Sequence, residues 1–192
     1  MTTSLKLHYQ GDPVLQRVAD PVKGIEDPQF QIFLDDLIDA CFLYDGVGIA
    51  APQVGTSLQV FIMASQPNSR YPDAPAMEPE AVINPKILFQ SEEQEYSWEG
   101  CLSVPGMRGK VPRPVRIEVE YINRHGAPIR KTLENFEARL FLHEYDHLIG
   151  TLYPERMAPE DPLLSQEEYL ALVQKGREGA GKLEEGSENG HS

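Results

Sequence analysis

The segment His143-Glu144-Tyr145-Asp146-His147 is the most informative part of this 192-residue sequence. Two histidines four residues apart on an α-helix lie on the same face, so their imidazoles can bind one metal ion. The glutamate that follows the first histidine can accept a proton from a water molecule activated by that ion. The segment therefore predicts a metal-dependent hydrolase whose third ligand comes from elsewhere in the chain.

The residues around this segment predict that it is helical. Asn135 is a favourable N-cap for a helix that begins near Phe136, and Gly150 can end the helix in a left-handed conformation. Apolar residues recur at helical spacing on the face that carries His143 and His147. A single histidine on such a face is usually a core residue with a backbone partner. The pair with its intervening glutamate favours metal binding instead.

Helical signals also occur on both sides of the central segment. A helix is expected over residues 29–44, directly after the capping pair Asp27-Pro28. A C-terminal helix is expected to begin at a capping box formed by Ser165 and Glu168. Gly176 is its expected stop.

Strand-like runs fill much of the sequence between the first helix and the histidine motif. Their alternation of apolar and polar residues is typical of antiparallel sheets, and residues 66–79, with four prolines, are expected to form a surface loop. The expected strands cover residues 5–9, 60–64, 81–84, 87–95, 117–121 and 129–133. We therefore expect an α+β fold in which antiparallel or mixed β-sheets pack around a central helix carrying the histidine motif, with an N-terminal helix and a C-terminal helix.

Length and composition limit the possible organisation and partners. The length suits one catalytic domain, expected over residues 1–178, followed by a disordered Gly- and Glu-rich tail over residues 179–192. The net charge of −13 disfavours binding to nucleic acid or to an anionic membrane. Residues 1–7 lack a targeting signal, and no apolar run reaches membrane-spanning length, so a cytoplasmic protein is expected. A monomer is expected as well.

The two cysteines have different expected roles. Cys41 lies in the apolar pattern of the helix over residues 29–44, so it is expected to pack as a small apolar side chain. Cys101, within Glu99-Gly100-Cys101-Leu102-Ser103, is the candidate third metal ligand, because a thiolate and two imidazoles leave one coordination position open. Glu99 is either a solvated loop carboxylate or a hydrogen-bond partner of a ligand or of nearby backbone.

Residues 46–55 contain three glycines and two alanines, which would allow the backbone to approach a ligand closely. Gln53 supplies the only polar side chain of this stretch. Taken alone, the stretch is more simply an ordinary Gly-rich connection. Its glycine spacing does not follow a strand as a dinucleotide-binding fingerprint requires, which disfavours phosphate binding.

Together the three segments resemble the peptide deformylases. The family's motifs Gly-x-Gly-hydrophobic-Ala-Ala-x-Gln, Glu-Gly-Cys-Leu-Ser and His-Glu-x-x-His all occur in the expected order, within a resemblance that spans residues 5–158. Two departures stand out. Leu142 replaces the glutamine that often precedes the first motif histidine. The Pro-rich segment 66–79 is longer than usual, so the access of substrates to the site and the choice among them are left open.

The resemblance implies removal of the formyl group from N-formylmethionyl nascent peptides, with release of formate. It implies Fe(II) bound by Cys101, His143 and His147, with Ni, Co or Zn able to take the same site. Glu144 would accept the proton of the attacking water and return it to the departing amine.

The resemblance also assigns the groups that contact the substrate. The Gln53 side-chain amide and the Leu102 backbone N–H would stabilise the oxyanion. Gly48 would contact the substrate backbone, and Val47 and Leu140 are candidates for the methionine pocket.

Two other functions compete with this one. A metalloprotease could use the same helix, but the only histidine after His147 is His191 in the tail, so the further ligand of the usual zinc proteases is missing. A non-catalytic metal-binding or ribosome-docking module would have no need for Glu144 and Gln53 beside its metal. Some relatives are thought to contact the ribosome transiently through a C-terminal helix, but the acidic end of this chain gives that no support.

Overall fold

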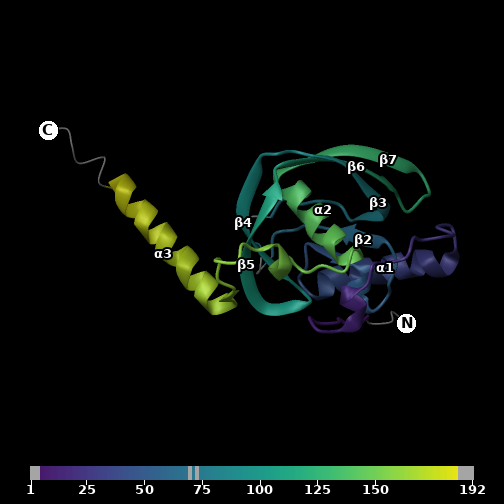
Figure 1. Cartoon of the computed structure of the whole chain (residues 1–192), viewed down its shortest axis with the longest axis horizontal. Helices are drawn as coiled ribbons and strands as arrows, with labels where there is room; N and C mark the ends of the chain where they lie inside the picture. Colours follow the sequence, from purple (N-terminus) through teal and green to yellow (C-terminus); the bar gives the residue numbers. More distant parts are fainter. Residues whose placement is uncertain (1–4, 69–70, 72–73, 186–192) are drawn as a thin grey trace.

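The computed structural model describes residues 5–68, 71 and 74–185, with side chains through residue 175. Two sheets surround the central helix α2 (Asn135–Leu148), which packs against strands of both (Figure 1). Neighbouring strands within the sheets pair antiparallel. The larger sheet has the order β1 (Gly48–Ala50), β2 (Val60–Met63), β3 (Glu80–Gln90), β6 (Arg116–Ile122), β7 (Pro128–Glu134). The smaller sheet has the order β4 (Gln94–Cys101), β5 (Val104–Pro114), β8 (Leu164–Ser165). The predicted α+β fold is confirmed.

The outer helices start where the sequence predicts. In α1 (Pro28–Leu43), the Asp27 carboxylate accepts the backbone N–H of Gln29 at 2.9 Å. Before α3 (Gln166–Glu185), Ser165 and Glu168 form the expected reciprocal capping bonds, at 2.7 and 3.2 Å. The described residues also form three short 3₁₀ helices: η1 (Pro13–Gln16), η2 (Ala51–Val54) and η3 (Tyr153–Arg156).

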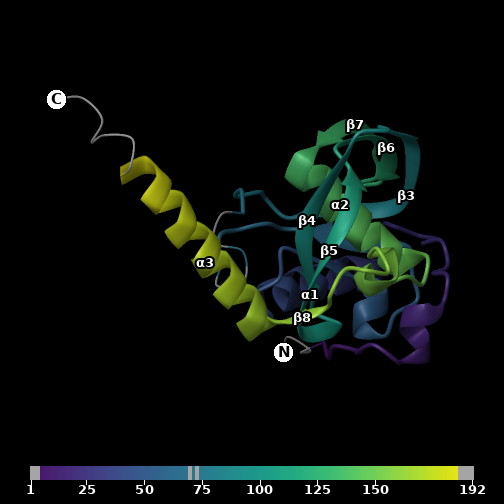
Figure 2. The same ribbon diagram turned by 60° about the vertical axis from the view of Figure 1, so that its left-hand side comes forward.

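The C-terminal helix α3 projects away from the two sheets (Figures 1 and 2). Its predicted stop at Gly176 is wrong, because the helix continues to Glu185. The expected disorder is therefore not found over residues 179–185, and residues 186–192 lie outside the described part of the chain. The domain boundary at residue 178 stays a prediction. No helix in the described ranges is long and apolar enough to cross a bilayer.

Several strand predictions need correction. Residues 5–9 form no strand. Their backbone groups form hydrogen bonds with segments outside the sheets: the His8 N–H donates to the Gln53 carbonyl of η2 at 2.8 Å. The runs at 81–84 and 87–95 belong largely to one strand, β3, which continues through two register shifts in its pairing with β6 and ends at Gln90. Strand β5 was not predicted at all, because its prolines and glycines mimic a loop.

The central helix is held between the sheets by its apolar face. Phe141 packs edge-on against Phe61 of β2, with ring centroids 5.1 Å apart. Asn135 is not the N-cap; it is the first helical residue, with a positive φ of 50°, and Glu134 takes the cap position. Gly150 follows the helix in the expected left-handed conformation, with φ of 74°. Cys41, within α1, is fully buried in the core, as predicted.

Candidate metal centre and its pocket

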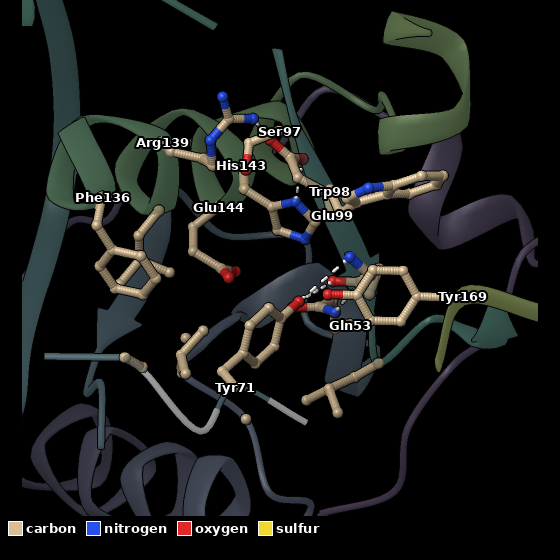
Figure 3. A pocket seen from close by; sticks show the side chains of 18 residues that line it. Gln53, Tyr71, Ser97, Trp98, Glu99, Phe136, Arg139, His143, Glu144 and Tyr169 are labelled. Carbon is tan, nitrogen blue, oxygen red and sulfur yellow. Dashed lines mark hydrogen bonds and ion pairs between the residues drawn. The ribbon is translucent and has the colours of Figure 1, made fainter. Parts of the chain in front are cut away.

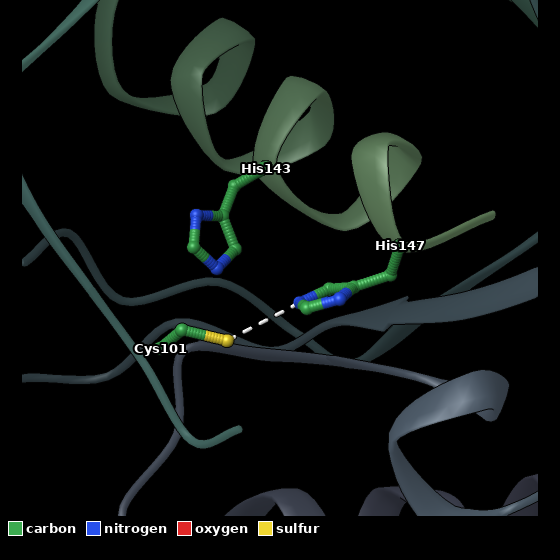
Figure 4. A group of neighbouring side chains, drawn as sticks. All are labelled: Cys101, His143 and His147. Carbon is green, nitrogen blue, oxygen red and sulfur yellow. Dashed lines mark hydrogen bonds between the residues drawn. The ribbon is translucent and has the colours of Figure 1, made fainter. Parts of the chain in front are cut away.

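The three predicted metal ligands come together in the structure. Cys101 ends β4, whereas His143 and His147 lie one turn apart on α2 (Figure 4). One possible ligand atom from each residue lies within 4.8 Å of the other two. The Cys101 Sγ atom is 3.3 Å from Nε2 of His147, and both residues are buried. The group has the soft and borderline donors that suit Zn²⁺, Fe²⁺ or a related divalent ion.

The surroundings of Cys101 favour its thiolate form. Burial raises the pKa of a thiol, but the nearby His147 and His143 outweigh this and hold the pKa of Cys101 well below its ordinary value. The Ser103 backbone N–H and the Gln53 side-chain amide also point at the sulfur, each at 3.4 Å. Since the thiolate is the form that binds metals, these surroundings favour the binding of a metal ion by Cys101.

Glu99 orients the first histidine ligand. Its Oε2 atom lies 2.8 Å from Nδ1 of His143, which leaves Nε2 of that ring to face the cluster. Arg113 donates to both carboxylate oxygens, at 2.9 and 3.0 Å, and Arg139 adds a bond of 2.9 Å to Oε1. Burial raises the pKa of Glu99, but His143 and Arg113 lower it to well below its usual range. The structure therefore supports the second role considered for Glu99, in which it is a hydrogen-bond partner of a metal ligand.

A second buried carboxylate extends this network along α2. Asp146 accepts a bond from Arg113 at 2.7 Å and another from Arg156 at 2.7 Å. Arg113 of β5 therefore links the carboxylate beside Cys101 to the helix that carries both histidines. Sequence reasoning missed the roles of Arg113, Arg139 and Asp146, although Asp146 lies inside the motif itself.

Glu144 is buried and faces the pocket beside the cluster (Figure 3). Its Oε2 atom has no hydrogen-bond partner among the described residues. Burial raises the pKa of Glu144 to about 7, although His143 and His147 act in the opposite direction. A Cβ atom on Gly48 would lie 2.6 Å from Oε1 of Glu144, so any larger residue where β1 passes would force this carboxylate to move.

Gln53 is fixed in η2 with its amide directed at the cluster. The Ala50 backbone N–H donates to Oε1 of Gln53 at 2.9 Å, which sets the direction of the amide group. Its Nε2 atom donates to Cys101 Sγ and, at 3.2 Å, to Oγ of Ser103. The Gly-rich segment therefore delivers one buried polar donor to the candidate site.

A pocket opens beside these groups and joins all three motifs (Figure 3). The predicted Val47, Gly48, Leu102 and Leu140 line it. Aromatic residues from distant segments also line the pocket, and none of them was predicted: Tyr71, Trp98, Phe136 and Tyr169. Tyr169 belongs to α3 and Tyr71 to the Pro-rich loop, so no local pattern connects them to the site.

Comparison with known proteins agrees with this geometry. Residues 4–162 match the family described as polypeptide deformylase. The chain is 51% identical over 165 residues to peptide deformylase 2 of Nostoc sp., covering 86% of this chain and 92% of that protein. It is 47% identical over 147 residues to peptide deformylase 1 of Bordetella pertussis, covering 77% and 84%.

Solved structures give the same result. The class I type b peptide deformylase of Acinetobacter baumannii, bound to Met-Ala-Ser, superposes with a TM-score of 0.78 at 41% identity, covering 82% of this chain and 100% of that one. The peptide deformylase of Thermotoga maritima gives a TM-score of 0.73 at 39% identity, covering 82% and 99%. This chain therefore belongs to the polypeptide deformylase family, and it is a hydrolase that removes the formyl group from the N-terminus of newly synthesised polypeptides.

Proposed function

We propose that this deformylase acts through a divalent metal ion held by Cys101, His143 and His147, and that the ion is Fe(II) in the cell, with Ni, Co or Zn able to replace it. The donor set supports the proposal, because a cysteine sulfur and two imidazoles converge within 4.8 Å of one another, with Cys101 and His147 buried. The contact between Glu99 and His143 fits as well, since it fixes the ring orientation that a ligand needs. When bound, the ion would supply Lewis acidity to the formyl oxygen and lower the pKa of a nearby water.

Glu144 is proposed to move the proton. Its side chain would accept a proton from the attacking water and deliver it to the nitrogen that leaves with the peptide. Burial raises the pKa of this carboxyl group, to about 7 in the metal-free site, and a raised pKa favours a group that must hold a proton between the two steps. The unpartnered Oε2 atom supports this role, since it is available for a bond to water.

Gln53 and Leu102 are proposed to stabilise the negative charge that develops on the formyl oxygen. The Gln53 amide is held by Ala50, so it can donate with little reorganisation. The same amide donates to the Cys101 sulfur at 3.4 Å, and a substrate oxygen could replace that contact. The Leu102 backbone N–H belongs to the residue directly after the ligand cysteine and would supply a second donor.

The substrate is proposed to be an N-formylmethionyl nascent peptide. Val47 and Leu140 would contact the methionine side chain, and Phe136 adds an aromatic face to the same pocket. The Gly48 backbone would contact the peptide, since no side chain intervenes there.

We propose further that the protein is a cytoplasmic monomer that acts on nascent peptides with no more than transient contact with the ribosome. The net charge of −13 supports the absence of specific nucleic-acid or membrane recognition.

The test is formate release from formyl-Met-Ala-Ser by protein loaded anaerobically with Fe(II) or Ni(II). Release from this peptide, with none from the unformylated or N-acetylated peptide, is the expected result. Cleavage of unformylated casein would instead indicate a protease. Metal content measured on the same samples distinguishes an empty site from an inactive one. Metal-loaded protein that releases no formate would therefore contradict the proposal.

A further inference from the structure

The pocket lies between the free edges of the two sheets. Strand β1 is at one end of the larger sheet and β4 is at one end of the smaller sheet. Residues 46–48 line the pocket on the first side, and residues 97–101 line it on the second. An extended peptide can add to an exposed strand edge through its backbone hydrogen bonds. A peptide in this pocket would therefore meet backbone groups of β4 beside the ligand Cys101.

In the structure these backbone groups already have a partner. The Tyr71 hydroxyl donates to the Gly100 carbonyl at 3.0 Å and accepts the Gly100 N–H at 3.2 Å (Figure 3). Gly100 immediately precedes Cys101, and both its backbone groups are directed away from β5, since one side chain outside the sheet binds them both. Tyr71 thus fills the hydrogen-bonding position that a peptide strand would use nearest the metal cluster.

Tyr71 is held in this position by contacts on its other side. Its ring lies over the guanidinium of Arg108, 4.7 Å from ring centroid to Cζ. Arg108 in turn stacks on Tyr169 of α3 at 5.4 Å and donates to Gln166 at 2.8 Å. A Cβ atom on Gly100 would lie 2.5 Å from Nη1 of Arg108, so glycine is needed for this close packing. The ring can keep its contact with Arg108 even if the hydroxyl bonds are lost.

We propose that Tyr71 competes with the peptide substrate for Gly100. In the free enzyme its hydroxyl is the hydrogen-bond partner of the Gly100 N–H and carbonyl at the edge of β4. It is displaced when a peptide backbone pairs with these groups. The hydroxyl then re-forms its two bonds when product leaves. Such an exchange keeps the buried backbone groups paired throughout, and it lowers affinity for substrate and product alike.

The test is Tyr71→Phe, with Tyr44→Phe as the matched control. The phenylalanine keeps the ring over Arg108 and removes only the hydroxyl. Tyr44 also donates its hydroxyl to a backbone carbonyl, that of Leu5 at 2.8 Å, but does not line the pocket. Trp98 is the single tryptophan and lines the pocket, so its fluorescence reports binding of the product peptide Met-Ala-Ser independently of turnover.

For Tyr71→Phe we expect the Kd for Met-Ala-Ser and the KM for formyl-Met-Ala-Ser to fall by about three- to tenfold, as removal of a competing hydrogen-bond partner implies. The kcat should stay within about twofold, because the change affects ground state and transition state equally. Tyr44→Phe should leave Kd and KM at the wild-type values. An unchanged or raised Kd for Tyr71→Phe would overturn the proposal, since Tyr71 would then be a bystander or a direct contact to the peptide.

Hydrogen exchange of the Gly100 amide gives a second, independent readout. In the wild-type enzyme the amide should be protected both with and without Met-Ala-Ser. In Tyr71→Phe it should exchange quickly in the free protein and become protected when the peptide saturates the pocket. If saturating peptide leaves this amide unprotected in the variant, the peptide does not pair at Gly100, and the proposal fails.

Discussion

The Nδ1 atom of His143 lies 2.8 Å from a Glu99 carboxylate that is itself bound by two buried arginines. The histidine is therefore anchored to β4, the same strand that ends in Cys101. A change at Glu99 should affect stability and metal affinity together, because it touches both the ligand and the charge balance of the interior.

Glu99→Gln should destabilise the protein by about 3–5 kcal/mol, because it leaves Arg139 without its buried counter-charge and Arg113 with Asp146 alone. The affinity for metal should fall by about 10- to 100-fold, as loss of a ligand's orienting partner usually causes. Thermal unfolding and competition with a chromogenic chelator measure the two effects. Glu95→Gln is the matched control, since Glu95 is exposed and meets Arg139 at 3.5 Å; it should cost less than about 1 kcal/mol. Equal effects of the two variants would contradict the role of Glu99.

Glu144→Gln separates proton transfer from metal binding. The amide is nearly isosteric and should leave the cluster of Cys101, His143 and His147 intact, but it cannot take a proton from water. We expect kcat to fall by about 10²- to 10⁴-fold with metal content unchanged. Metal analysis and formate release on the same preparation check this. Near-normal turnover would show that another group moves the proton.

The candidate site could be predicted from the sequence because its main groups lie in short, local patterns. Helical spacing alone puts His143 and His147 on one face, and the Gly-rich segment around Gln53 signals close approach by its composition. The burial of Cys41 could be predicted for the same reason, because helical spacing places this residue on the apolar face of an amphipathic helix.

Features that depend on distant partners could not be predicted in this way. Arg113 meets Glu99 and Asp146 across 14 and 33 residues of chain, and no local pattern encodes such pairs. Strand β5 was missed because Pro112 and Pro114 are usual signs of a loop, yet the antiparallel pairing with β4 accommodates them. Tyr71 and Tyr169 reach the pocket only because the Pro-rich loop and α3 both meet Arg108.

The two cysteines should differ sharply in alkylation. Burial, with a smaller contribution from Glu144, raises the pKa of Cys41 to about 12, whereas the two histidines favour the thiolate of Cys101. Iodoacetamide should therefore label Cys101 in metal-free protein and leave Cys41 unmodified, because the thiolate is the nucleophile. Bound Zn(II) or Ni(II) should protect Cys101. Peptide mapping by mass spectrometry identifies the site, and Cys101→Ser should abolish labelling of the folded protein. Labelling of Cys41 at a similar rate would contradict its burial.

The turn after α2 packs closely against η1, and two glycine variants test what this contact adds to stability. Gly150 and Gly126 have similar positive φ values of 74° and 79°, but only Gly150 is crowded: a Cβ there would lie 2.7 Å from the Gln16 backbone, whereas nothing lies within 4 Å at Gly126. Gly126→Ala should cost about 1–2 kcal/mol for the left-handed conformation alone. Gly150→Ala should cost about 1–3 kcal/mol more, because the backbone of η1 must also move. Urea unfolding of the two variants gives the difference directly. Equal losses would mean that the contact between Gly150 and Gln16 adds nothing to the conformational requirement.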